Sequence, residues 1–202
     1  MPTARPADPG PRVGVVVPIR SFRQGKGRLA RVLDDDARVA LVRDMADAVI
    51  GAARGHPTVV VSSDPEVAAW CAAHGIDRVD DPGSLDASAD AGRRWARERD
   101  LARVAIVHAD LPFASTLDAL AVDDERVAVV VPDRRDDGTP ALSVPSHAPF
   151  RFAYGPGSFV RHVAEAERCR LVVSVVRDAA LAFDVDVPED LEHMRSRCSR
   201  SR

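Results

Sequence analysis

Apolar runs of strand length alternate along this chain with segments in which apolar residues recur at helical spacing. Residues 13–17 form a run of apolar side chains broken only by one glycine. Residues 36–53 instead place apolar side chains three and four positions apart, which predicts an amphipathic helix. The same patterns predict further strands at 58–62, 103–108, 126–131, 141–144 and 171–175, and further helices at 64–73, 85–99, 116–121, 158–167 and 188–197.

This alternation predicts an α/β fold. Several of the predicted strands are apolar on both faces, as strands are when helices cover both sides of a mostly parallel sheet. We therefore expect a three-layer α/β/α sandwich, built as a single domain over residues 12–202, with no internal repeat. Residues 1–11 contain four prolines and few apolar side chains, which predicts a disordered lead-in.

Composition excludes several classes of protein. The formal net charge is -3, so we expect no general electrostatic binding of nucleic acid. No apolar run is long enough to cross a membrane or to form the core of a secretion signal. The three cysteines are far apart and form no C-x-x-C pair, which disfavours a zinc ribbon or a disulfide framework. We expect a cytoplasmic protein, and a homodimer is compatible with the sequence.

The loop after the first predicted strand is rich in cations. Ligands of such sheets bind beyond the carboxyl ends of the strands. Residues 18–28 place Arg20, Arg23, Lys26 and Arg28 there, with two glycines among them, and Lys26 is the single lysine of the chain. Cations on a flexible backbone suit a polyphosphate. The spacing matches neither a Walker A loop nor a G-x-G-x-x-G fingerprint, and a solvated basic loop is the alternative.

Three carboxylates follow later strands. Asp110 comes just after the strand at 103–108, and Asp184 and Asp186 are two positions apart, so both point to one side of an extended segment. One or two carboxylates together with substrate phosphates make a typical magnesium site. Asp110 is therefore well placed to hold Mg²⁺, and the Asp184/Asp186 pair permits paired carboxylates on one metal ion or on two. The alternatives are that Asp110 orients the turn before a proline and that Asp186 caps the last helix.

Small residues form two turns that suit a second anion. One ends in Thr139, and the other, residues 154–158, contains Gly155 and runs into the predicted helix at Ser158. Gly and Ser at a helix N-terminus can bind a phosphate or a carboxylate. A loop followed by a Ser-capped helix explains the pattern equally well.

The residues that carry covalent catalysis are missing from the pattern. No G-x-S-x-G motif is present, and the cysteines lack basic loop neighbours. A polyphosphate, Mg²⁺ and a second anion are the components of metal-assisted nucleotidyl transfer. A phosphate acceptor is already ionised and needs no general base, so the roles of His108 and His162 stay open.

Taken together, these segments resemble the guanylyltransferases of deazaflavin coenzyme F420 biosynthesis. The resemblance extends from Val13 to Leu191 and rests on the order and spacing of several motifs. These are VVVPIRSF at 15–22, KGRL at 26–29, VVVSSD at 59–64, ADLP at 109–112, GT at 138–139, YGPGSFVRH at 154–162 and DVDVPEDL at 184–191.

The resemblance implies a fold of the nucleotide-diphospho-sugar transferase type and a specific reaction. GMP would pass from GTP to phosphoenolpyruvate or 2-phospho-L-lactate, both small phosphorylated three-carbon acids, with release of pyrophosphate. Phosphoenolpyruvate is preferred, because the Arg- and Ala-rich composition is typical of actinobacteria, in which the family uses it. The implied roles are catalysis for Lys26, Arg28 and Asp110; nucleotide binding for Arg20, Arg23, Lys26, Leu85 and Asp86; acceptor binding for Thr139, Gly155 and Ser158; and Mg²⁺ binding for Asp110, Asp184 and Asp186.

Two positions depart from the family pattern. The chain has Asp86 where the family pattern has asparagine, and Pro140 where asparagine follows Gly138-Thr139. A carboxylate is a poorer neighbour for phosphate than an amide is. Two alternatives therefore stay open: another nucleotidyltransferase of the same fold, or a catalytically inactive nucleotide-binding domain.

Overall fold

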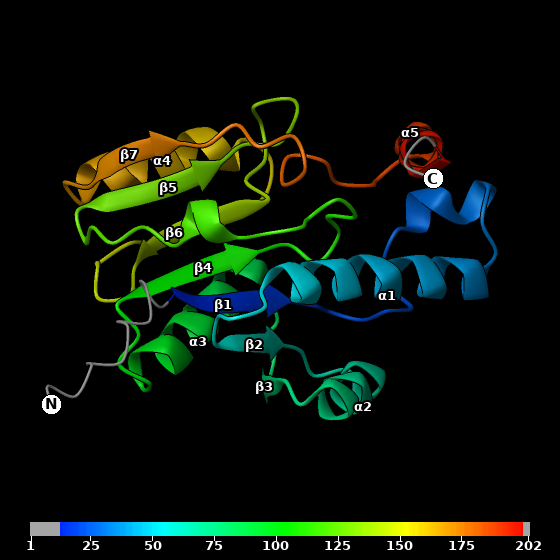
Figure 1. Ribbon diagram of the computed structural model, residues 1–202, viewed down its shortest axis with the longest axis horizontal. Coiled ribbons are helices and arrows are strands. Elements are labelled where there is room, and N and C mark those ends of the chain that lie inside the picture. The colour runs from blue at the N-terminus through cyan, green and yellow to red at the C-terminus, as the bar shows by residue number, and fades with distance from the viewer. Residues whose placement is uncertain (1–12, 200–202) are drawn as a thin grey trace, which may run out of the picture.

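Seven strands form one twisted sheet at the centre of the molecule. A computed structural model describes residues 13–199, so the predicted lead-in at 1–11 lies outside the described residues. The spatial order is β3-β2-β1-β4-β6-β5-β7 (Figure 1). The strands are β1 (Val13–Pro18), β2 (Thr58–Val61), β3 (Asp77–Val79), β4 (Arg103–Val107), β5 (Val127–Val131), β6 (Ala141–Pro145) and β7 (Val172–Val175). Only β6 runs antiparallel to its neighbours among these strands, so the predicted mostly parallel sheet is confirmed.

Helices cover both faces of the sheet. They are α1 (Asp35–Ala52), α2 (Pro65–His74), α3 (Leu85–Arg97), α4 (Ser158–Arg168) and α5 (Pro188–Ser199), with 3₁₀ turns η1 (Gly27–Arg31) and η2 (Asp118–Leu120). Apolar side chains of α1, α2 and α5 join one core, whereas those of α3 and α4 join a second core. The three-layer sandwich predicted from the apolar pattern is therefore confirmed.

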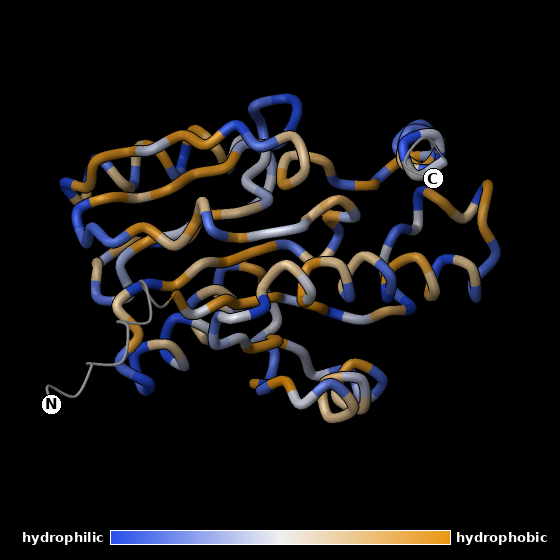
Figure 2. The backbone as a smooth tube through the Cα atoms, viewed as in Figure 1, coloured by the Kyte–Doolittle hydropathy of each residue, from blue (hydrophilic) through white to orange (hydrophobic). Residues whose placement is uncertain are grey.

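The alternation of side chains along β1 explains why the sheet has two cores. Val15 and Val17 belong to the core under α1, and Val16 belongs to the core under α3. Figure 2 shows the hydrophobic colouring concentrated along the strands at the centre. Gly92 lets α3 approach the sheet closely, because a Cβ atom added there would lie 2.2 Å from a methyl group of Val16. None of the described helices has the length and apolar character needed to span a membrane.

Local differences from the predicted elements have identifiable causes. The predicted helix at 116–121 is a single 3₁₀ turn, η2, because one turn already buries Leu117 and Leu120. Neither β3 nor η1 is predicted by the sequence pattern. β3 has three residues, of which Asp77 and Arg78 are exposed, and its pairing with β2 defines it as a strand. Such an edge strand carries no apolar run for a pattern to detect.

Strand direction brings three loops to one edge of the sheet. Because β1 and β4 are parallel, their carboxyl ends, Pro18 and Val107, lie at the same edge. β6 is antiparallel to β4 and pairs its first residue, Ala141, with Val107, so the loop that precedes β6 lies at this edge too. We call it the site edge.

The chain then returns from the opposite edge. β6 ends at Pro145, which pairs with Arg103 at the start of β4. α4 begins at Ser158, whose hydroxyl lies 3.2 Å from that of Thr139 at the site edge. Residues 146–157, the return segment, therefore cross the sheet between α3 and α4.

Candidate active site

Lys26 connects three segments that are far apart in the sequence. Its Nζ donates to Asp110 Oδ2 at 2.5 Å and to Asp186 Oδ1 at 2.6 Å. The Lys26 backbone is left-handed, with φ of 57°, at the residue that precedes η1. Burial opposes the charge of the ammonium, but the two carboxylates prevail and raise the pKa of Lys26 above its usual range. The ammonium is therefore a fixed positive charge at the site edge.

The carboxylates around Lys26 lie close enough to repel one another. Burial, together with the charges of Asp110 and Asp186, raises the pKa of Asp184. Burial also acts to raise the pKa of Asp110, but the nearby Lys26 ammonium lowers it overall. Among the described residues Asp110 Oδ1 has no hydrogen-bond partner, although it is buried. This oxygen is free to accept a cation.

These carboxylates fit a magnesium ion that arrives with a phosphate ligand. No group of three or more His, Cys, Asp or Glu side chains within residues 13–199 forms a complete metal site as the side chains lie. Magnesium, however, usually takes only one or two protein carboxylates and completes its octahedron with phosphates and water. The buried free oxygen of Asp110 and the crowded Asp184 and Asp186 suit that kind of binding.

The cationic loop lines a cavity beside these carboxylates. The cavity has a volume of about 490 Å³, and its wall includes Arg20, Lys26, Arg28 and Leu85. Arg23 does not line it. Arg23 is an exposed side chain that pairs with Glu66 at 2.6 Å, so the structure places it apart from the cavity that we predicted it would line with the other cations of the loop. The cause is the turn of the loop, which buries Phe22 and directs the next side chain outward.

A second cavity of about 640 Å³ adjoins the first and shares several of its wall residues. It is lined by Thr139, Gly155 and Ser158, and also by Asp184 and Asp186. The structure therefore places the three predicted acceptor-binding residues together, on the far side of the carboxylates from Arg20. The shared wall residues are Arg28, Leu85, His108, Asp110 and Asp186.

Asp86, which we predicted at the nucleotide, contacts the backbone of the return segment. Its Oδ1 accepts a hydrogen bond from the backbone N of Tyr154 at 2.6 Å, and Asp86 lines neither of the two cavities. The carboxylate thus attaches the first turn of α3 to the end of the return segment. Only the fold brings these residues together, since they are 68 positions apart.

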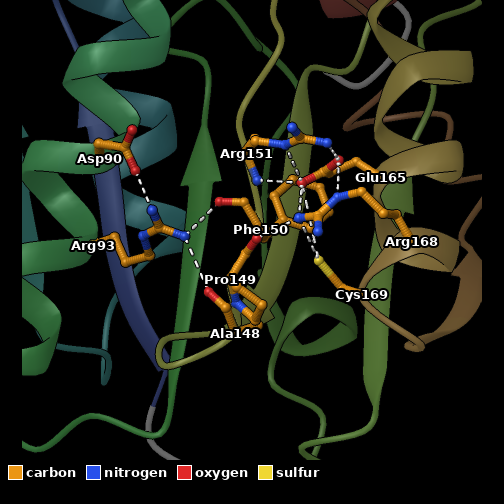
Figure 3. Close-up of polar contacts among 9 residues, drawn as sticks. All are labelled: Asp90, Arg93, Ala148, Pro149, Phe150, Arg151, Glu165, Arg168 and Cys169. Atoms are coloured by element: carbon orange, nitrogen blue, oxygen red, sulfur yellow. Dashed lines mark hydrogen bonds and ion pairs between the residues drawn. The ribbon is translucent and has the colours of Figure 1, made fainter.

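The return segment is held by charged residues of both flanking helices (Figure 3). Arg93 of α3 donates to the carbonyl oxygens of Ala148 and Phe150, at 3.2 and 2.6 Å. Glu165 of α4 accepts from the backbone N and the guanidinium of Arg151, at 2.8 to 3.1 Å. These contacts support the loop that carries Gly155. The sequence pattern does not reveal them, because the helices meet the segment only in the fold.

The C-terminal carboxylates are held by a residue that sequence reasoning missed. Arg134 donates to Asp190 Oδ1 at 2.7 Å and to the carbonyl oxygen of Asp184 at 3.3 Å. Asp190 Oδ2 in turn accepts from the backbone N atoms of Asp186 and Val187. The carboxylate that binds the backbone N–H groups at the start of α5 is therefore that of Asp190. The carboxylate of Asp186 pairs with Lys26 instead. The charged run at 133–137 was the available signal.

Two histidines differ in their surroundings: His108 lines both cavities, and His162 is buried behind the second. His108 follows β4, and its Nε2 is buried with no hydrogen-bond partner among the described residues. Burial lowers the pKa of His108. His162 is fully buried on α4, with hydrogen-bond partners at both ring nitrogens. Both imidazoles are therefore neutral near pH 7.

Comparison with known proteins agrees with this architecture. The profile of the family described as "Guanylyl transferase CofC like" matches residues 13–197. A curated relative from Sphaerobacter thermophilus, named phosphoenolpyruvate guanylyltransferase, is 39% identical over 187 residues, which cover 89% of this chain and 90% of that protein. A relative from Phenylobacterium zucineum, named 3-phospho-D-glycerate guanylyltransferase, is 33% identical over 198 residues, with 92% and 91% covered.

Solved structures share the fold at lower identity. A Desulfovibrio desulfuricans G20 protein, proposed to be a nucleotide-diphospho-sugar transferase, gives a TM-score of 0.74 at 19% identity, over 90% of this chain and 85% of that chain. A nucleotidyl transferase from Methanothermobacter gives a TM-score of 0.66 at 16% identity, over 96% of this chain and all of the other. These likenesses confirm the nucleotide-diphospho-sugar transferase type of fold.

The family profile spans nearly the whole described chain, and the curated relatives cover about nine-tenths of it. The resemblance drawn from the motifs is therefore confirmed, and this chain belongs to the CofC-like family of guanylyl transferases.

Proposed function

We propose that this chain transfers GMP from GTP to phosphoenolpyruvate, with Mg²⁺ bound at Asp110, Asp184 and Asp186 and with release of pyrophosphate. The observation that supports this most strongly is the position of Lys26. Its ammonium contacts Asp110 and Asp186, two carboxylates that line both of the adjoining cavities. One cavity suits a nucleotide triphosphate, and the other suits a small acid.

The first cavity supplies cations for a triphosphate. Arg20 and Arg28 line it beside Lys26, and within the described residues neither arginine has an ion-pair partner. Guanidinium groups bind phosphate oxygens through charge-assisted hydrogen bonds. When Mg²⁺ is bound, it supplies further positive charge for the phosphate oxygens. We assign Arg20, Lys26, Arg28 and Leu85 to the nucleotide.

The second cavity supplies hydrogen-bond donors for the acceptor. Thr139 and Ser158 present hydroxyl groups 3.2 Å apart. The backbone N–H groups of Thr139 and Gly155 take part in no hydrogen bond within residues 13–199. Donors at a helix N-terminus suit an anion. The phosphate or carboxylate of a three-carbon acid would accept from these groups.

The proposed chemistry needs no base from the protein. An oxygen of the acceptor phosphate attacks the α-phosphorus of GTP, a new P–O bond forms, and the bond from the α-phosphorus to pyrophosphate breaks. The attacking oxygen is already ionised near pH 7, so no proton has to be removed. Lys26 and Arg28 then serve to position the phosphates and to stabilise the negative charge that develops on them.

The relatives support the choice of acceptor. One is named for phosphoenolpyruvate and another for 3-phospho-D-glycerate. Both acids are phosphorylated three-carbon carboxylates, and the hydroxyl and N–H donors at the second cavity suit such anions. We propose phosphoenolpyruvate because the more similar of these two relatives carries that name. The product would be the activated acid used in coenzyme F420 biosynthesis, and the substrates favour a cytoplasmic location.

The two departures from the family pattern do not argue for loss of activity. Asp86 uses its carboxylate to accept a backbone N–H, a role that needs only an oxygen acceptor. Pro140 contributes its carbonyl oxygen, which accepts from the backbone N of His108 at 2.9 Å. Neither residue lines the two cavities.

The reaction is tested directly with the purified chain, GTP and Mg²⁺. We expect pyrophosphate release and a product with the mass of the GMP–acid conjugate when phosphoenolpyruvate is added. Parallel reactions contain 3-phospho-D-glycerate, 2-phospho-L-lactate or no acid, and others replace GTP with ATP or CTP. Pyrophosphate that appears equally without any acid, or with none of the acids, would refute the proposed function.

A further inference from the structure

His162 lies at the centre of a buried chain of hydrogen bonds behind the second cavity. The side chain is fully buried on α4. Its Nε2 lies 3.1 Å from the backbone N of Ala153, and its Nδ1 lies 3.1 Å from Thr139 Oγ1. The ring also contacts Tyr154 edge-on, with the ring centroids 4.8 Å apart. These contacts define the tautomer of the ring.

The contact with Ala153 determines where the imidazole proton sits. A backbone N–H can only donate, so Nε2 must accept and carries no hydrogen. A neutral imidazole has one N–H, which must then be on Nδ1. That N–H donates to Thr139 Oγ1 and occupies a lone pair of the hydroxyl.

This tautomer leaves one hydroxyl hydrogen for a ligand. Ser158 Oγ and Thr139 Oγ1 lie 3.2 Å apart, so one donates to the other. If Ser158 donates, the hydrogen of Thr139 is free; if Thr139 donates, the hydrogen of Ser158 is free. Both residues line the second cavity. In either case one O–H donor is available to an anion there.

We infer that His162 is a positioning residue for the acceptor, because it commits a lone pair of Thr139 and so turns the Thr139–Ser158 pair into an O–H donor toward the second cavity. This inference rests on the proposed function. With the opposite tautomer, Nδ1 would accept a hydrogen bond from the Thr139 hydroxyl. Thr139 would then have to accept from Ser158, and neither hydroxyl would have a hydrogen left to donate to the ligand.

The surroundings of His162 keep the ring neutral. Burial is the main cause that lowers its pKa to about 4, and the charges of Arg161 and His108 act in the same direction. Glu165, on the same helix, opposes the shift. Tyr154 and Phe150 supply ring contacts from the return segment. We call the hydrogen bonds from Ala153 N to His162 and from His162 to Thr139 the relay. A second proton, on Nε2, would face the Ala153 N–H, so the relay excludes the charged form of the imidazole.

Kinetics on four variants test this role. His162→Phe keeps a ring but removes both hydrogen bonds, and we expect the KM for the acceptor to rise about tenfold, or about 1.4 kcal/mol, while the KM for GTP is unchanged. Thr139→Val should produce a similar rise, and the double variant should add little to it, because both changes remove one relay. His162→Gln can accept and donate with its amide, and should recover part of the affinity.

Phe150→Leu is the matched control. Phe150 packs on the His162 ring but carries no polar atom, so we expect a loss of stability with the acceptor KM unchanged. An unchanged acceptor KM in a folded His162→Phe variant, or fully additive effects with Thr139→Val, would overturn the inference.

The tautomer can be measured without any activity. Long-range ¹H–¹⁵N correlation spectra of the labelled chain, with His162 assigned by its loss in His162→Gln, should show the proton on Nδ1 and no titration between about pH 5.5 and 8. A proton on Nε2 would overturn the inference even if the enzyme is active. Conversely, an inactive chain with the Nδ1–H tautomer would refute the proposed function and leave the relay intact.

Discussion

Two neighbouring carboxylates fix the position and the charge of Lys26, the single lysine of the chain. Lys26 is nearly buried, and its ammonium contacts two carboxylates at 2.5 and 2.6 Å. Such a cation is expensive to bury unless it is paired. Because Asp110 and Asp186 provide that pairing, they hold the ammonium where we propose that Mg²⁺ and the triphosphate bind.

Replacing Lys26 tests whether this charge serves the nucleotide. We expect Lys26→Met to lower kcat/KM for GTP by about 100-fold or more, since a buried charge that contacts phosphates contributes several kcal/mol. We also expect Mg²⁺ without nucleotide to bind more tightly to this variant in isothermal titration calorimetry, because the ammonium no longer competes for the carboxylates.

Arg23→Met is the control for that change. Arg23 is a cation of the same loop, but it lies outside both cavities and pairs with Glu66 on the surface. Its replacement should leave kcat/KM for GTP within about twofold of the wild type, since exposed ion pairs contribute little. Equal losses in the two variants would contradict the distinction that the structure draws between the two cations.

At the scale of elements, the return segment depends on the helices beside it. Arg93 of α3 and Glu165 of α4 hold residues 148–151 from opposite sides (Figure 3). The segment has no regular structure of its own, so its backbone groups need these partners. Its far end carries Tyr154 and Gly155 to the second cavity.

The Glu165 cluster makes part of the stability depend on pH. Hydrogen bonds from Arg168 and Arg151 lower the pKa of Glu165 below its ordinary value. As pH falls, the Glu165 carboxylate is therefore protonated in the unfolded chain before it is protonated in the folded one. The stabilisation by this cluster is complete above about pH 5 and declines progressively as pH falls below about 4.3. We expect Glu165→Gln to cost about 1–2 kcal/mol at pH 7, measured by urea unfolding.

The pH dependence separates this cluster from general acid effects. Between about pH 7 and pH 4, the wild type should lose more stability than Glu165→Gln does, because the variant has no carboxylate to protonate. Glu167→Gln, an exposed neighbour on the same helix, is the control and should follow the wild type. A parallel decline in all three proteins would show that the cluster contributes no pH-dependent stability.

At the scale of the whole molecule, strand order determines what meets at the site edge. Lys26 is 84 positions from Asp110 and 160 positions from Asp186. β1 and β4 are neighbours in the sheet. The C-terminal segment returns to them because α5 contributes to the same hydrophobic core as one face of these two strands. A ligand that binds here would connect the beginning, the middle and the end of the described chain.

Ligand binding should therefore stabilise the entire fold. With GTP and Mg²⁺ at about 100 times the dissociation constant, the expected gain is about 2.7 kcal/mol, or a rise of about 5–10 °C in Tm for a domain of this size. In Asp110→Asn the unliganded fold should remain, but the Mg²⁺-dependent part of the rise should disappear. The measurement is a thermal melt with and without Mg²⁺, and an undiminished rise in the variant would remove Asp110 from the metal site.

Most strands and helices, and several ligand-binding candidates, could be predicted from local sequence patterns. Strands such as 13–17 and 58–62 are short valine-rich runs, and helices such as 158–167 have an apolar stripe, so their positions follow from the local pattern. The residues that follow strand ends, such as Lys26 and Asp110, could be chosen as ligand candidates because such sheets bind ligands there. Each of these inferences needs only neighbouring residues in the chain.

Other features depend on long-range pairing, which a single sequence does not encode in any local pattern. Strand β3 exists because β2 offers it hydrogen bonds, and β6 reaches the site edge because it runs antiparallel. Arg23 turns outward and Asp86 binds a backbone N–H for the same reason. Which strands pair, and which side chains then face one another, is decided by the packing of two cores on one sheet, and that is where the site acquires its geometry.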